Sequence, residues 1–206
     1  MVISMRIILL ITVICLSLLS IPALAQLDSG PSGIGVYADM GGMVNSVMQD
    51  EGLLEVYLLL MGCEAEIGIQ AWEASIWVDG SLTMLGYELP YEGFTIGVLP
   101  DITVGVSDGG ANDPLFTEPI MHLATLHFIV QGPEQGNIYI KANSAFGGSG
   151  SMGNYLPAYA DAASVGGLFA MYPSSGSVDQ PVFRVNGESP VATTVSPFAG
   201  VKALYR

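Results

Sequence analysis

The sequence predicts an all-β protein that folds as a single antiparallel β-sandwich of about ten strands. Three observations lead to this prediction. No stretch of ten residues shows the i, i+3, i+4 spacing of apolar residues that marks an amphipathic helix. Short runs of β-branched and aromatic residues recur instead, separated by clusters of glycine, proline and aspartate. About ten short strands in one chain close most readily as a sandwich or a barrel, and the sandwich is the form that we predict.

The first strand is expected at residues 34–38 and the second at residues 53–61. In the second run, a period of two places four apolar side chains on one face: Leu54, Val56, Leu58 and Leu60. Most residues of the opposite face are apolar as well. We therefore expect this strand to lie in the middle of a sheet, covered on much of both faces.

The next strand, at residues 71–79, is expected to have one face in the core and the other in solvent, because its residues alternate. The core face carries Trp72, Ala74, Ile76 and Val78. The solvent face carries Glu73, Ser75, Trp77 and Asp79. A flat aromatic ring among polar neighbours suits stacking on a sugar or anchoring on a protein. Trp77, Glu73 and Asp79 are therefore the predicted ligand-binding residues; the alternative is that a loop or a second layer covers Trp77.

The remaining strands follow the same signals of residue type and turn. They are expected at residues 84–89, 94–98, 102–106, 121–130, 137–142, 165–171 and 182–185. The glycine- and serine-rich stretch 143–157 is expected to be a loop, and residues 187–206 a C-terminal tail. The folded domain is thus predicted over residues 26–186.

Residues 1–25 are predicted to be an export signal that is cleaved before Gln26. A basic residue precedes the apolar run 7–19, and Ala23-Leu24-Ala25 supplies small residues at the two positions that signal peptidase reads. The alternative is a membrane anchor, but the run is shorter than the ~20 residues that span a bilayer. We expect a protein that is secreted, or at the cell exterior or in the periplasm of a bacterium, with no stable membrane span.

Cys63 is the single cysteine after the predicted cleavage, so no intramolecular disulfide is expected. The neighbouring Glu64 disfavours the thiolate. Cys63 is expected to be a buried or half-buried small residue at a strand end, with an intermolecular disulfide as the alternative.

Acidic residues dominate the charge of the chain. The sequence has 19 Asp and Glu against 5 Lys and Arg, a formal net charge of −14. Proteins that bind phosphate backbones present clustered lysine and arginine. Nucleic acid is therefore not an expected partner.

No signature in the sequence defines a reaction, and we assign no catalytic residue. The only histidines, His122 and His127, are five residues apart on one expected strand, so His122 should face the edge of the core and His127 the solvent. No zinc-binding helix or phosphate-binding loop occurs. The alternative is a carbohydrate-active hydrolase that uses two carboxylates, with candidates in two groups: Glu64, Glu66 and Glu73, or Glu88 and Glu92.

Calcium is a possible ligand of the loop at residues 108–113. Two carboxylates and one amide, from Asp108, Asp113 and Asn112, stand there beside flexible glycines, and Ca²⁺ prefers such oxygen ligands. The alternative is an ordinary acidic turn. No cofactor is required by the sequence, and a calcium-stabilised structural subunit of a surface layer remains a further alternative function.

The order of three segments resembles cohesin-like and carbohydrate-binding-like β-sandwiches of exported bacterial proteins. The segments are residues 53–61, 68–76 and 123–130, and the resemblance extends over residues 34–140. It implies a sandwich of the cohesin or jelly-roll type, and a cohesin proper would bind a dockerin. The chain also resembles exported bacterial proteins without an assigned activity, in the opening 33–39, the Trp72-Glu73 pair and the terminal residues 201–206.

These observations together predict an exported, non-enzymatic β-sandwich module. Its expected role is recognition of, or assembly with, a protein or a carbohydrate outside the cell.

Overall fold

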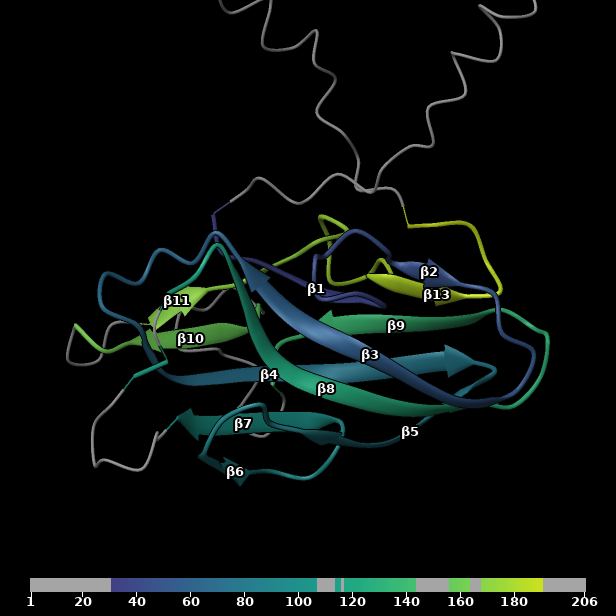
Figure 1. Cartoon of the computed structure of the whole chain (residues 1–206), viewed down its shortest axis with the longest axis horizontal. Coiled ribbons are helices and arrows are strands. Elements are labelled where there is room, and N and C mark those ends of the chain that lie inside the picture. Colours follow the sequence, from purple (N-terminus) through teal and green to yellow (C-terminus); the bar gives the residue numbers. More distant parts are fainter. Residues whose placement is uncertain (1–30, 107–113, 116, 144–155, 164–167, 191–206) are drawn as a thin grey trace, which may run out of the picture.

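The computed structural model describes residues 31–106, 114–115, 117–143, 156–163 and 168–190. These residues form thirteen strands in two sheets that pack against each other (Figure 1), which confirms the predicted all-β sandwich. They contain no helix, hence none that is long and apolar enough to cross a membrane. Several predicted features lie outside the described residues: the export signal at 1–25, the loop residues Asp108, Asn112 and Asp113, and residues 191–206 of the tail.

The first sheet has five strands in the spatial order β12, β1, β3, β8, β5. Their bounds are β1 Gly33–Tyr37, β3 Gly52–Met61, β5 Leu82–Glu88, β8 Ile120–Val130 and β12 Tyr172–Pro173. β3 lies between β1 and β8, and its residues Leu58, Leu59 and Leu60 are fully buried on both faces of the sheet. The prediction that this strand is central is confirmed.

The second sheet is organised around β4 (Ile69–Gly80). One edge of β4 pairs with β10 along its first half and with β9 along its second half, and the other edge pairs with β7, which in turn pairs with β6. β11 follows β10, while β13 and β2 follow β9. The bounds are β2 Ser46–Val47, β6 Gly93–Ile96, β7 Asp101–Val106, β9 Gly136–Lys141, β10 Ala158–Asp161, β11 Leu168–Ala170 and β13 Phe183–Val185. All pairings in the two sheets are antiparallel except β1 with β12 and β2 with β13.

The core lies between the inward faces of the two sheets and contains the side chain of Trp72, which is only 1% exposed. The Trp72 Nε1–H donates a hydrogen bond of 2.6 Å to the hydroxyl of Tyr91. That hydroxyl donates in turn to the carbonyl of Leu123 at 3.0 Å. Since Trp72 belongs to β4 and Leu123 to β8, Tyr91 links the two sheets through a buried polar chain.

The ten expected strands all occur near their predicted positions, although only the part of the 165–171 strand from Leu168 onward is described. Three short strands, β2, β10 and β12, were not predicted. Each is two to four residues long, and none lies in one of the longer β-branched or aromatic runs that the sequence analysis identified. Their strand character comes from pairing with longer neighbours.

The predicted opposite orientation of the two histidines is wrong. β8 contains a bulge, because Leu58 of β3 pairs with Ala124 while Leu59 pairs with His122, which leaves Leu123 as an extra residue. Leu123 and Ala124 are both buried, so the alternation of faces shifts by one residue at this point. His122 and His127 therefore both lie on the outer face of the first sheet.

Cys63 is half-buried just beyond the end of β3, as predicted. Burial is the main cause that raises the pKa of its thiol.

Candidate functional site: the outer face of the second sheet

The outer face of the second sheet carries two rows of side chains across five strands. Strand pairing defines each row, in the order β6, β7, β4, β10, β11. The first row is Phe94, Gly105, Ala71, Ala160 and Leu168, and the second row is Ile96, Thr103, Glu73, Ala158 and Ala170. We call the surface formed by these two rows the trough.

The middle of the trough is hollow because its residues are small. A depression of about 90 Å³ lies there, bordered by Ala71, Glu73, Thr103, Ala158 and Leu168, among others. Gly105 lies in its first row, and a Cβ at this position would stand 2.2 Å from Cζ of Phe94, so the exposed Phe94 ring would have to move. The ring of Phe94 thus lies directly over the backbone of β7.

Large apolar side chains stand exposed at the β6 side of the trough. Phe94 is 60% exposed and Ile96 53% exposed, and Val98, just beyond β6, is 84% exposed. β6 is an edge strand, and all four of its residues are exposed. An uncharged edge strand with exposed apolar side chains is a favourable surface for association with another chain.

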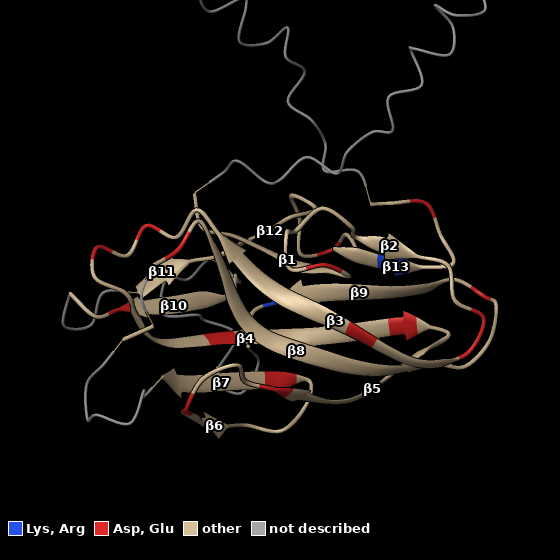
Figure 2. Cartoon of the chain, viewed as in Figure 1, with Lys and Arg blue, Asp and Glu red and all other residues tan. Residues whose placement is uncertain are grey.

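Glu73 is the ionisable residue within the trough. It is half-buried, and no other described side chain makes a hydrogen bond or ion pair with its carboxylate. Burial raises the pKa of Glu73 above its ordinary value, and the nearby Asp101 carboxylate adds to the effect. Figure 2 shows acidic residues on both β4 and β7, where these two residues lie. A carboxylate whose charged form is disfavoured by burial and by a neighbouring carboxylate is typical of a binding site.

This raised pKa predicts a pH-dependent effect of the substitution Glu73→Gln. A carboxyl group with a higher pKa in the folded state contributes stability below its unfolded pKa and loses that contribution as pH rises through the folded value. At pH 7 the Gln variant should therefore unfold at a slightly higher temperature than the wild type. The gain should disappear below pH 4.5, the ordinary pKa of the group.

Thermal melts at neutral and acidic pH measure this difference. The exposed Glu51→Gln substitution is the matched control, since it removes one carboxylate from the β2–β3 turn. An unchanged or lower melting temperature for Glu73→Gln at neutral pH contradicts the assignment.

The predicted residue Trp77 lies on the same outer face, and 46% of its surface is exposed, so no described loop or layer covers it. Its Nε1–H donates to Ser75 Oγ at 2.9 Å, and Lys141 Nζ lies 5.5 Å from the ring centroid. Asp79 is less available, because its carboxylate accepts hydrogen bonds from Asn137 and Tyr139 at 2.7 and 2.9 Å. The role of Trp77, Glu73 and Asp79 in ligand binding stays a prediction.

Sequence reasoning found Glu73 but missed the rest of the trough. Ala158 and Ala160 come from the unpredicted strand β10, and small residues give no signal of their own. Phe94 and Ile96 did have a signal, since they alternate within an expected strand, yet nothing in the sequence places them across β7 from Glu73.

The outer face of the first sheet also carries a group of polar side chains, centred on His127. His127 Nδ1 lies 4.0 Å from Glu55, and its Nε2 lies 3.8 Å from Glu88. The His122 Nε2 is 3.1 Å from Thr125 Oγ1, and burial lowers the pKa of the His122 imidazole.

Glu88 and Glu73, one from each group of hydrolase candidates, lie on the outer faces of different sheets. Among the described residues, no three His, Cys, Asp or Glu side chains form a cluster that could hold a metal ion.

Comparisons of the sequence with protein-family models and with curated proteins find no match. Among solved structures, the comparison finds cohesin domains. The sixth cohesin of scaffoldin B from Acetivibrio cellulolyticus, in complex with a Cel5 dockerin, is 13% identical; the match covers 77% of this chain and 100% of that chain, with a TM-score of 0.49. A non-cellulosomal cohesin from the archaeon Archaeoglobus fulgidus is 10% identical over 53% of this chain and 78% of that chain, with a TM-score of 0.30. At these identities and TM-scores, the likeness shows neither the family nor the function of this chain.

Proposed function

We propose that this chain is an exported, non-enzymatic recognition module that binds a partner protein outside the cell through the trough. The carrying observation is the position of Glu73, a half-buried carboxylate with a raised pKa, in a hollow beside the exposed apolar side chains of Phe94 and Ile96. The module presents an apolar anchor site and one charge for specificity. Interfaces commonly combine these two features.

The chemistry of the trough indicates what kind of partner fits. A partner with an apolar side chain against Phe94 and Ile96 and a basic group facing Glu73 would relieve both the exposed apolar area and the unpaired carboxylate. Such an ion pair would also remove the repulsion between Glu73 and Asp101. The strongly acidic chain favours the approach of a basic partner surface.

The test is affinity capture from the extracellular proteins of the source organism, followed by titration of the captured protein. Ile96→Asp is expected to weaken binding at least about tenfold, since it places a charge in the apolar anchor. The matched control is Leu53→Asp. Leu53 is 75% exposed on the outer face of the first sheet, so the substitution Leu53→Asp adds the same charge away from the trough.

Equal losses for Ile96→Asp and Leu53→Asp would contradict the proposal. Binding of a glycan that Trp77→Ala abolishes and Ile96→Asp leaves unchanged would favour the carbohydrate ligand instead. Turnover of a glycan that disappears on single Glu→Gln substitutions would favour the hydrolase. Calcium binding by Asp108, Asn112 and Asp113 is a separate proposal, tested by melting the protein with calcium and with chelator.

A further inference from the structure

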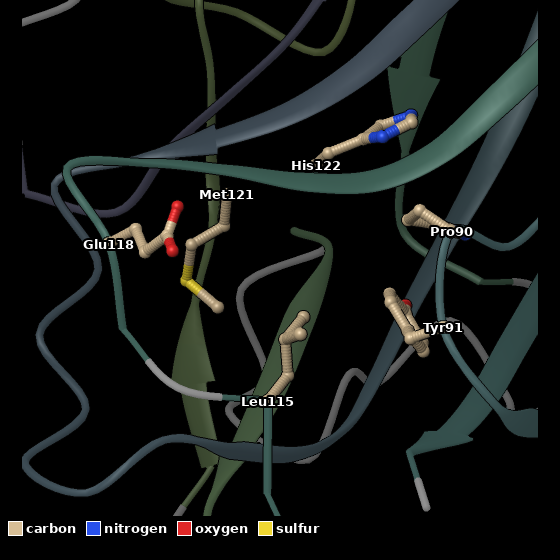
Figure 3. A pocket seen from close by; sticks show the side chains of 6 residues that line it. All are labelled: Pro90, Tyr91, Leu115, Glu118, Met121 and His122. Atoms are coloured by element: carbon tan, nitrogen blue, oxygen red, sulfur yellow. The ribbon is translucent and has the colours of Figure 1, made fainter. Parts of the chain in front are cut away.

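A second cavity opens at the side of the sandwich, where β5 leaves the first sheet (Figure 3). β5 pairs with β8 along Thr125–Val130 only, and the chain then passes through Pro90 and Tyr91 toward β6 in the other sheet. Among the described strands, the first half of β8 is consequently paired with β3 alone. The cavity in this gap has a volume of about 290 Å³ and is lined by Pro90, Tyr91, Leu115, Glu118, Met121 and His122.

Most of this lining is apolar or already hydrogen-bonded. Met121 is 3% exposed and projects from β8 toward the cavity, while the imidazole of His122 lies on the other side of the strand (Figure 3). The Tyr91 hydroxyl is occupied, because it accepts from Trp72 and donates to Leu123. Burial lowers the pKa of His122, which favours its neutral form, and its Nε2 is engaged with Thr125.

Among the six residues that line the cavity, Glu118 and His122 are the two acidic or basic ones. Glu118 is exposed, it lines the same cavity as Met121 (Figure 3), and no described side chain forms an ion pair with it. The lining therefore favours a ligand that combines an apolar body with a positive charge. The net charge of −14 disfavours an anion in the same place.

The volume indicates how large a body the cavity can enclose. At ~30 Å³ for each non-hydrogen atom, a volume like that of a water molecule in the liquid, the cavity holds a body of about ten atoms. This is the size of a small arylalkyl amine. The volume of the cavity is close to the lower limit of the range for small-molecule sites.

We propose that this cavity binds a small organic ammonium ion. The aryl or alkyl body lies against Leu115, Met121 and Tyr91, and the ammonium group pairs with the carboxylate of Glu118. The site is independent of the trough and of the protein partner proposed for it.

The test is titration of the full mature chain with three probes of one shape: phenethylammonium, phenethyl alcohol and phenylpropionate. Binding is followed by calorimetry and by the resonance of the Met121 methyl group, identified by its loss in Met121→Leu. Phenethylammonium is expected to bind most tightly and to shift this resonance. Glu118→Gln is expected to weaken its binding roughly three- to tenfold while leaving the alcohol unaffected.

The matched control is Glu51→Gln, which removes the same charge at the turn next to Gly52, whose partner Val130 is at the opposite end of β8. Its affinity for phenethylammonium should equal that of the wild type. The proposal is overturned if Glu51→Gln weakens binding as much as Glu118→Gln, if the alcohol or the anion binds as tightly as the ammonium ion, or if the Met121 resonance does not move.

Discussion

The substitution Trp72→Ala is expected to destabilise the protein by about 3–5 kcal/mol. Trp72 is 1% exposed and heads the largest buried side chains of the core, so its removal leaves a large cavity between the sheets. It also leaves the Tyr91 hydroxyl without its donor. Domains of this kind have a total stability of about 5–15 kcal/mol, so much of it is lost.

Denaturation by urea, followed by fluorescence and circular dichroism, measures this loss as a lower midpoint. Trp77→Ala is the matched control: it removes the same side chain from the same strand, but from a site that is 46% exposed. Its effect should not exceed about 1 kcal/mol. Similar losses for the two variants would mean that Trp72 does not hold the sheets together.

Gly80→Ala is expected to destabilise the protein by about 2–3 kcal/mol. Gly80 has a φ of +69°, a left-handed conformation that favours glycine. A Cβ at this position would also stand 2.0 Å from the carbonyl oxygen of Gln135, so the backbone must move. Gly80 ends β4 where the chain turns toward β5 in the other sheet. A backbone shift there disturbs the pairing of β4 with β9 and the pairing of β5 with β8.

Gly86→Ala is the control, because it adds the same methyl group to a glycine of β5 that has no positive φ, next to the register shift between Met84 and Gly86. No atom lies within 4 Å of the added Cβ. The stability of this variant should stay within about 0.5 kcal/mol of the wild type in the same urea titration. Comparable losses at Gly80 and Gly86 would contradict the role given to the positive φ.

The positions of the ten longer or better patterned strands could be predicted because alternation is a local property of the sequence. In β4, Trp72, Ala74 and Ile76 are buried and Trp77 is exposed, as their spacing indicates, whereas Ser75, which was expected in solvent, is buried as well. The same rule was wrong for His122, because one extra residue in β8 shifts the alternation. Nothing in the residue types of Leu123 and Ala124 marks that bulge.

The candidate site could be predicted only in part, for a similar reason. Glu73 and Trp77 followed from the alternation of their own strand. The trough needs Phe94 from β6 and Ala158 from β10 beside Glu73, and these neighbours are set by strand pairings far apart in the sequence.

The sequence by itself determined the all-β class, the inward face of β4 and of β8 after its bulge, and the acidic character of the chain. These properties depend on residue type and on spacing within one strand. Only the tertiary structure decided which strands are neighbours, where β8 bulges and where the two hollows open. The physical reason is that sheet pairing is selected by how the whole core packs, so segments distant in the chain are brought together.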